Sequence, residues 1–194
     1  MLAQHGLARD DPPHLRLLGG VIGCSTAFHL AQRGCTGVVL LEKNKIASGA
    51  SSKAAGQVIH GGATEAQFQI AKYSWEDLET FHENGDIQLH RGPWFAPLRE
   101  NDPEDFNELF KAAPDVARKL GLEGTTRFIG REEVFERYPG MNRDHFRPGG
   151  HDLGKLQGGL LGSENDAWLD PYLLTTTYAQ YARNRGLRSA PGWH

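Results

Sequence analysis

The 194-residue sequence lacks the features of several classes of protein. It has no run of about 18 apolar residues, which a membrane-spanning helix would need. Its 21 Lys and Arg stand against 24 Asp and Glu, and the resulting formal net charge of -3 offers no basic surface for a nucleic acid. Cysteine is scarce too. Only Cys24 and Cys35 are present, so a reducing compartment is the expected environment.

The N-terminal segment also lacks a targeting signal. Its apolar run is too short for a secretory signal peptide, and Asp10 and Asp11 are unusual in a mitochondrial transit peptide. We therefore expect a cytoplasmic protein, with a mitochondrial location as the alternative.

Metal ligands with a recognisable spacing are missing as well. His145, His151 and Asp152 fall in a segment rich in Gly, Asn, Asp and Arg, but they do not form the closely paired ligands of a structural metal site. The sequence predicts a solvated loop there and no bound metal.

What the sequence does contain is a glycine turn followed by a helix pattern, in residues 18–42 (LGGVIGCSTAFHLAQRGCTGVVLLE). Gly20 and Gly23 have the spacing of the last two glycines in G-x-G-x-x-G. In that pattern the missing side chains let backbone amides approach a pyrophosphate and let the helix pack close to a strand. The helix is predicted from an apolar stripe and ends at Gly34; the stripe consists of Ile22, Ala27, Leu30 and Ala31.

A buried strand and an acidic residue complete this pattern. Val38–Leu41 is apolar throughout, which predicts a strand buried on both faces, and Glu42 stands at its end. A carboxylate at this distance from the glycines typically binds ribose hydroxyls. The order predicts a dinucleotide-binding βαβ unit for FAD or NAD rather than NADP, whereas the glycines alone would also fit an ordinary tight turn.

The segment before the turn departs from the pattern. The first fingerprint glycine would fall at residue 18, which is Leu18, and a Cβ there threatens the tight turn or the pyrophosphate. Arg16 places a charge where a central parallel strand normally has Val or Ile. We expect both residues to weaken cofactor binding.

Residues 43–62 form a run of small and hydroxyl-bearing residues without an aromatic side chain. Such a loop lets its backbone come close to a ligand and offers N–H and O–H donors, although an ordinary flexible surface loop has the same composition. It lacks the 3.6-residue apolar period of a helical connection.

Together these pieces resemble the FAD-dependent D-amino-acid oxidase superfamily, especially its glycine oxidase, sarcosine oxidase and dimethylglycine dehydrogenase branch. The resemblance covers about residues 17–187 and rests on GGVIGCSTAFHLAQRG, VVLLEK, SGASSKAAG and GGLLGSENDAWLDPYLL. It implies that the pyrophosphate lies along Gly20, Val21, Ile22 and Gly23, and that Glu42 and Lys43 face the adenosine ribose. The ribityl chain and the isoalloxazine would lie along Ser51, Ser52, Ala55, Gly56 and Gln57. Some members carry a covalent flavin on a histidine where this chain has Lys53, so the resemblance implies non-covalent FAD.

The function implied by the resemblance is oxidation of a C–N bond in an amino acid or an N-methylated amine, by hydride transfer to the flavin. The alternatives are a catalytically inactive truncated remnant, a non-enzymatic nucleotide-binding fragment, or an NAD-binding protein. No catalytic residue is predicted. Lys53, Arg91 and Arg99 are candidates for charges near the flavin or the substrate carboxylate, but each is more simply an exposed side chain, and His60 is more simply structural.

Further elements follow from periodicity and turn residues. Residues 65–82 predict a helix with Phe68, Trp75 and Phe81 in the core, and 87–89 and 94–96 predict two short antiparallel strands. Three more helices are predicted: one capped by Asp102 with Phe106, Leu109, Phe110, Ala113 and Leu120 inward, one at 131–138, and one at 171–185 opened by Asp170 and ended by Gly186.

The overall expectation is an α/β fold: a Rossmann-like FAD-binding βαβ unit with the beginning of an α+β substrate domain, incomplete at the C-terminus. The predicted divisions are an atypical segment (1–16), the FAD-binding unit with its flavin loop (17–85), a partial substrate domain (86–168) and a truncated helix returning to the FAD domain (169–194). The last residues, LRSAPGWH, suggest no third strand. Our hypothesis is a mis-assigned start and a truncation or frameshift, with a partner chain as one way to complete the fold.

Overall fold

The computed structural model describes residues 15–35, 37–62, 64–142, 150 and 152–189. These residues form a mixed α/β fold, as the sequence predicts, and they divide into two units that we describe separately. Unit 1 contains the described residues up to Gly56, the segment Phe81–Gln88, and those from Leu169 onward. Unit 2 contains the described residues of Gln57–Thr80 and Leu89–Trp168.

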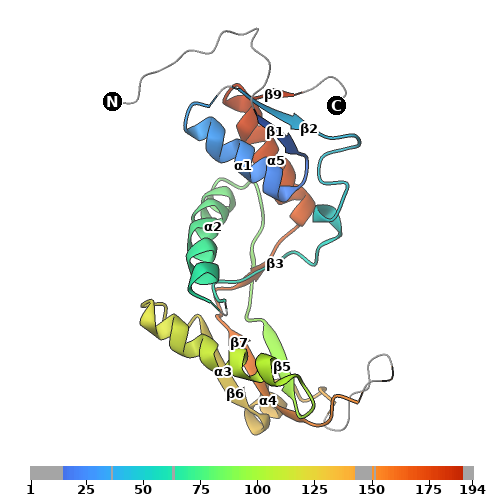
Figure 1. Cartoon of the computed structure of the whole chain (residues 1–194), viewed down its shortest axis with the longest axis vertical. Coiled ribbons are helices and arrows are strands. Elements are labelled where there is room, and N and C mark those ends of the chain that lie inside the picture. The colour runs from blue at the N-terminus through green and yellow to red at the C-terminus, as the bar shows by residue number, and fades with distance from the viewer. Residues whose placement is uncertain (1–14, 36, 63, 143–149, 151, 190–194) are drawn as a thin grey trace. The chain divides into compact units, whose positions relative to one another are not determined.

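Unit 1 is a parallel sheet covered by helices. Its strands are β1 (Leu15–Leu18), β2 (Val38–Leu41) and β9 (Arg188–Ser189), in the order β1-β2-β9. The register pairs Leu15 with Val38 at one end and Leu18 with Leu41 at the other. Helix α1 (Val21–Gln32) joins the first two strands and packs beside α5 (Pro171–Asn184), as Figure 1 shows. The predicted βαβ unit is therefore present.

Helix α1 forms where the apolar stripe predicts it, although one member of the stripe is wrong. Its buried face consists of Cys24, Ala27, Phe28 and Ala31. The ring of Phe28 contacts those of Phe81 and Tyr178, with centroids 5.7 and 5.4 Å apart. Ile22 is 80% exposed, because it lies two residues before Cys24 and therefore on the side of the helix that faces away from the core. Gly34 ends the helix with a φ of 78°, as predicted.

Strand β2 forms at the predicted residues but is buried on one face only. Val38 and Leu40 are 3% and 1% exposed, whereas Leu41 is 36% exposed and Val39 is half-buried. Helix α1 packs against one face of the strand, and within the described part of the chain fewer residues pack against the other face. The continuous apolar run therefore overstated the burial of this strand.

The prediction that no third strand follows the last helix was wrong. Arg188 and Ser189 pair in parallel with Val39 and Leu40 as β9. A ladder of backbone hydrogen bonds along the open edge of a strand does not require apolar side chains, so the hydrophobic pattern gave no signal for it. Helix α5 itself begins as predicted, because the Asp170 carboxylate accepts hydrogen bonds from the backbone N–H groups of Tyr172 and Leu173.

Unit 2 contains an antiparallel sheet with β7 in its centre. The strands are β5 (Phe95–Arg99), β6 (Thr126–Gly130) and β7 (Leu156–Gly162), in the order β5-β7-β6. Helix α3 (Glu104–Lys119) contacts β6, and α4 (Arg131–Arg137) contacts β7. Two clusters of buried residues form the core around this sheet: Ile129, Val134, Leu156 and Leu161 in one, and Phe110, Ala113 and Leu160 in the other.

A second sheet of unit 2 shows that the predicted pairing of 87–89 with 94–96 was wrong. Its short strands are β3 (Gln57–Val58), β8 (Ala167–Trp168) and β4 (His90–Arg91), with β8 in the centre. Residues 90–91 thus pair with β8, and β5 pairs with β7. Both segments bond to strands far away in the sequence, which local patterns do not report.

The two longest helices agree with the prediction in their cores but not in every detail. Helix α2 (Glu65–Glu83) buries Phe68, Trp75, Leu78 and Phe81. In α3, Phe110 and Ala113 are buried as predicted, whereas Phe106 and Leu109 are 40% and 41% exposed. Asp102 does not cap α3. Its Oδ2 atom accepts a hydrogen bond from the backbone N–H of Arg99 at 2.6 Å, and Pro103 occupies the cap position.

Candidate dinucleotide-binding site

The turn between β1 and α1 in unit 1 has the features of an anion-binding site. Strand β1 ends at Leu18, two glycines follow, and the first helical hydrogen bond runs from Cys24 N–H to the Gly20 carbonyl at 2.9 Å. Among the described residues, the N–H groups of Ile22 and Gly23 have no acceptor. The N-terminus of this 12-residue helix therefore presents free donors and the positive end of the helix dipole.

The turn is tight because α1 begins directly against the end of β1. A Cβ atom on Gly23 would lie 1.8 Å from the carbonyl oxygen of Leu18, which no side chain can tolerate. A Cβ on Gly19 would lie 2.8 Å from Cβ of Glu42. At Gly20 the nearest atom would be Ser51 Oγ, at 3.4 Å, so this glycine faces open space. Gly23 thus permits the close packing of α1 on β1, whereas Gly20 is not required by any contact within the described residues.

Glu42 lies at the same edge of the sheet as the glycine turn, because β1 and β2 are parallel. Its side chain is half-buried, and its Oε1 atom accepts a hydrogen bond from the backbone N–H of Asn44 at 3.0 Å. No basic side chain pairs with this carboxylate in the described part of the chain, so it can accept hydrogen bonds from a ligand. Lys43 is exposed beside it.

The loop after Glu42 folds back onto the glycine turn. Ala47 N–H bonds to the Gly19 carbonyl at 2.9 Å, and Ala47 is 1% exposed with a φ of 63°. Ser51 opens a short 3₁₀ helix, η1 (Ser51–Lys53), and its Oγ atom accepts a hydrogen bond from Val21 N–H at 2.9 Å. The sequence did not single out Gly19 or Ala47. The pair Gly19-Gly20 could have indicated a tight turn at Gly19, whereas no feature of the sequence marks Ala47.

The rest of the predicted flavin segment continues from η1. Ser52, Lys53 and Ala55 are exposed. Gly56 has a φ of 75°, and a Cβ there would lie 2.0 Å from the Leu169 carbonyl oxygen, so only glycine fits. Gln57 is exposed in β3 and belongs to unit 2. The structure therefore brings Gly20, Val21, Gly23, Glu42 and Ser51 to one edge of unit 1.

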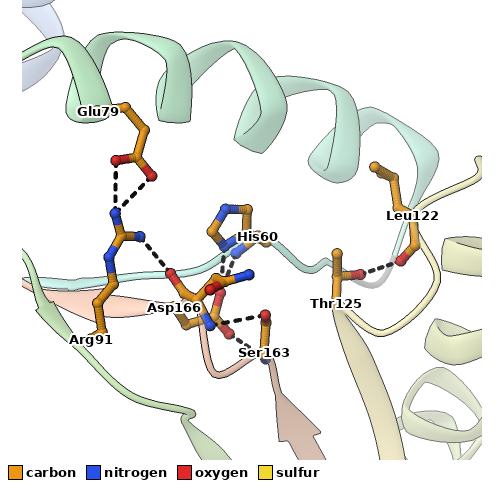
Figure 2. A network of polar contacts seen from close by, with 8 residues as sticks. His60, Glu79, Arg91, Leu122, Thr125, Ser163 and Asp166 are labelled. Atoms are coloured by element: carbon orange, nitrogen blue, oxygen red, sulfur yellow. Dashed lines mark hydrogen bonds and ion pairs between the residues drawn. The ribbon is translucent and has the colours of Figure 1, made fainter.

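Unit 2 contains a polar network around Asp166 (Figure 2). Asp166 is 1% exposed, and its Oδ1 atom accepts from both the backbone N–H and the Nδ1 atom of His60, at 2.6 and 2.9 Å. Its Oδ2 atom accepts from Ser163 N–H at 2.8 Å. The His60 ring stacks on Trp75 with centroids 3.8 Å apart. These contacts fit the structural role predicted for His60.

The two arginines considered for a substrate carboxylate differ in environment. Arg91 is exposed, as predicted, and its guanidinium donates to both oxygens of Glu79, each at 2.7 Å, and to the Asn165 carbonyl at 2.8 Å (Figure 2). Its Nη1 and Nη2 atoms are therefore both held by protein acceptors. Arg99 was expected to be exposed, and this was wrong: it is 7% exposed. Burial of Arg99 follows from its position at the end of β5, where α3 and the Asp102 turn begin.

The described residues contain neither a membrane-spanning helix nor a cluster of metal ligands. None of their helices is long and apolar enough to cross a membrane. They also hold no group of three His, Cys, Asp or Glu side chains suited to a metal ion. The candidate ligands His145 and His151 lie outside the described residues, whereas Asp152 Oδ1 accepts a hydrogen bond from Gly154 N–H.

Comparison with known proteins finds one matching family and several relatives with related names. The model of a family described as FAD dependent oxidoreductase (DAO) matches residues 19–190. Mitochondrial dimethylglycine dehydrogenase of Rattus norvegicus is 31% identical over 180 residues, which cover 87% of this chain and 18% of that protein. A 4-methylaminobutanoate oxidase (formaldehyde-forming) of Paenarthrobacter nicotinovorans is 42% identical over 133 residues, covering 66% of this chain and 16% of that protein. The chain thus spans less than a fifth of the length of these relatives.

Solved structures with the same fold include an L-proline dehydrogenase from P. horikoshii, with a TM-score of 0.70 and 21% identity. That comparison covers 92% of this chain and 44% of the other. A glycine oxidase from Bacillus cereus has a TM-score of 0.61 and 26% identity, covering 90% of this chain and 45% of the other.

The close approach at Gly23 leads to a first prediction. We expect Gly23→Ala to lower the free energy of unfolding by about 2 kcal/mol or more, because the added methyl group meets a backbone oxygen that cannot move without separating α1 from β1. Gly20→Ala is the matched control and should cost less than about 1 kcal/mol, since its Cβ has room. Urea unfolding followed by circular dichroism measures both values. Equal stabilities of the two variants would contradict the proposed packing.

The two cysteines should differ strongly in reactivity. Cys24 is fully buried, and this burial, together with the nearby charge of Glu42, raises the pKa of its thiol to about 12. Cys35 is exposed. At pH 8 we expect dithiobis-nitrobenzoate to react quickly with one thiol in the folded protein and with two after unfolding, because only the thiolate reacts. Cys35→Ser should abolish the fast phase; a fast phase that persists in this variant would show that Cys24 is accessible.

Proposed function

Since the chain belongs to the FAD-dependent oxidoreductase family that matches residues 19–190, we propose that unit 1 binds FAD and that the protein acts in the oxidation of an amine. The observation that carries this proposal is the edge of unit 1 where the free N–H groups of α1, the Ser51 hydroxyl and the Glu42 carboxylate meet. Donors for a pyrophosphate and an acceptor for ribose hydroxyls are the two features that a dinucleotide requires.

In this proposal each part of FAD has its own set of residues. The pyrophosphate is held by the backbone of Gly20, Val21, Ile22 and Gly23. Glu42 accepts hydrogen bonds from the adenosine ribose, with Lys43 beside it. The ribityl chain and the isoalloxazine are assigned to Ser51, Ser52, Ala55, Gly56 and Gln57. By the resemblance described above, Lys53 stands where some members of the family carry the flavin on a histidine, and we therefore propose non-covalent binding.

The substrate class is inferred from the relatives. Their names refer to dimethylglycine and 4-methylaminobutanoate, and a further relative, from Homo sapiens, is a sarcosine dehydrogenase. These are amino acids with a methylated nitrogen, so we propose an amino acid or an N-methylated amine as substrate. When bound, FAD supplies the oxidising chemistry by accepting the hydrogen and electrons of a C–H bond beside the substrate nitrogen, whereas the protein orients the reactants and excludes water.

We also propose a cytoplasmic location, with mitochondria as the alternative suggested by the names of the mitochondrial relatives.

FAD titration tests the proposal directly. We expect a saturable change in the flavin absorption bands near roughly 375 and 450 nm when the purified chain is added to FAD. Precipitation with acid should then release the flavin into the supernatant, because no covalent bond holds it. Gly20→Ala is the test variant and should weaken flavin binding, because it spares the fold but places a methyl group where the pyrophosphate approaches. Flavin binding that is unaffected by Gly20→Ala would contradict the site, and flavin retained in the precipitate would contradict non-covalent binding.

The departure at Leu18 gives a second test. Leu18 is 75% exposed at the end of β1, directly before the glycine turn, so its side chain competes for the space that a cofactor needs. We expect Leu18→Gly to lower the Kd for FAD several-fold. Leu15→Gly, at the other end of the same strand, should not tighten binding. Isothermal titration calorimetry measures both, with thermal unfolding without FAD as the check on folding; tighter binding by both variants, or by neither, would rule out a role of Leu18.

A further inference from the structure

Unit 2 contains a cavity of about 410 Å³ that takes no part in the FAD site proposed above. It lies beside the segment that precedes α2, between that helix, α3 and the central strand β7. The larger side chains of its lining include Ile59, Trp94, Phe110 and Leu160.

Small residues keep this cavity open. Gly61, Gly62, Ala71 and Ala113 all line it and contribute little or no side-chain volume. A Cβ on Gly61 would lie 2.8 Å from Thr126 Cγ2, and one on Gly62 would lie 2.6 Å from Cβ of Gln67. The backbone of this segment is thus packed against its neighbours.

The cavity is apolar, which defines the chemistry of what it can hold. Among the described residues of its lining, Gln67 and Trp94 have the only polar side-chain atoms, and the Gln67 Oε1 atom already accepts a hydrogen bond from Thr64 N–H at 3.2 Å. The Trp94 Nε1 atom is buried and has no hydrogen-bond partner in the described part of the chain. None of the described lining residues is charged. A charged ligand would lose its hydration without gaining a partner, so the ligand must be neutral.

The volume sets the size of the ligand. An apolar cavity of about 150 Å³ is enough to bind benzene. Pockets that bind small molecules typically have volumes of about 300–1,000 Å³ and mostly apolar walls. At about 410 Å³, this cavity matches a molecule of two or three fused or linked rings, or an aliphatic chain of similar volume.

A route to the cavity exists in the folded protein. Ile70 on α2 and Leu109 on α3 both line it, yet they are 66% and 41% exposed. Large apolar side chains that are exposed around a hollow often mark a binding site. A ligand can therefore enter between these two side chains without unfolding of the core.

We propose that this cavity between α2 and α3 is a binding site for a neutral, predominantly apolar small molecule. The site is built by unit 2 alone and is independent of FAD. Its occupant makes van der Waals contacts with Trp94, Phe110 and Leu160 and forms no obligatory hydrogen bond.

The test uses N-phenyl-1-naphthylamine, a neutral aromatic probe whose fluorescence rises in apolar surroundings, with the full 194-residue chain. The wild-type chain should show saturable binding to one site. Ile70→Asp places a charge at the cavity and should weaken binding at least about tenfold. Tyr73→Asp is the matched control, because Tyr73 is on the same helix and 65% exposed but does not line the cavity. Leu109→Asp should repeat the effect from the opposite helix.

Thermal unfolding of each variant shows whether it is folded, and saturating FAD provides a second control. Three results would overturn the proposal. The first is equal weakening by Ile70→Asp and Tyr73→Asp, which indicates general adsorption. The second is displacement of the probe by FAD, which places it in the nucleotide site. The third is a concentration-dependent dimer that binds no probe and becomes monomeric with Ile70→Asp, which makes the cavity an interface between two copies of the chain.

Discussion

The close contact between Gly23 and the Leu18 carbonyl determines the arrangement of unit 1. With no side chain at Gly23, helix α1 begins directly against the end of β1, and its first N–H groups are left beside the carboxyl ends of the strands. The parallel pairing of β1 with β2 brings the end of β2, and with it Glu42, to that edge. Ser51 then reaches the first N–H group of the helix from a loop that is distant in the sequence. The missing Cβ atom of Gly23 thus places the helix N-terminus, around which Glu42 and Ser51 complete the candidate site.

In unit 2 the corresponding constraint is electrostatic. The buried Asp166 carboxylate is satisfied by donors from two separate segments, His60 and the Ser163 turn, while the Asp166 backbone carbonyl accepts from Gly92 N–H. A buried carboxylate without these donors would cost several kcal/mol, so the segments must come together for it to be tolerated. His60, which follows the predicted flavin loop, is held in this network and by the ring of Trp75. Its position is explained without a catalytic role.

The features of the candidate site are of two kinds: those that any dinucleotide requires, and those that point to FAD or depart from the common pattern. The glycine turn, the helix dipole and the acidic residue after β2 are requirements of any dinucleotide site, and family membership assigns FAD as the ligand. Leu18 departs from this general pattern, since it stands where the fingerprint has glycine. Its side chain extends into solvent, so the backbone keeps the tight turn even though the residue type does not favour it.

The sequence determined which segments fold and what kind of site they can build. Periodicity located α1 and α2, and the residues that open and end a helix located α5. The spacing of Gly20, Gly23 and Glu42 predicted the βαβ unit. These signals all depend on residues close together in the chain. Only the tertiary structure decided the partners of 90–91 and 95–99, the pairing of β9 with β2, and the contact of Ser51 with Val21. These contacts join residues far apart in the sequence, either by pairing of distant strands or by a loop that folds back onto an earlier element. For the same reason the exposure of Ile22 and the burial of Arg99 could be known only once the neighbouring elements were in place.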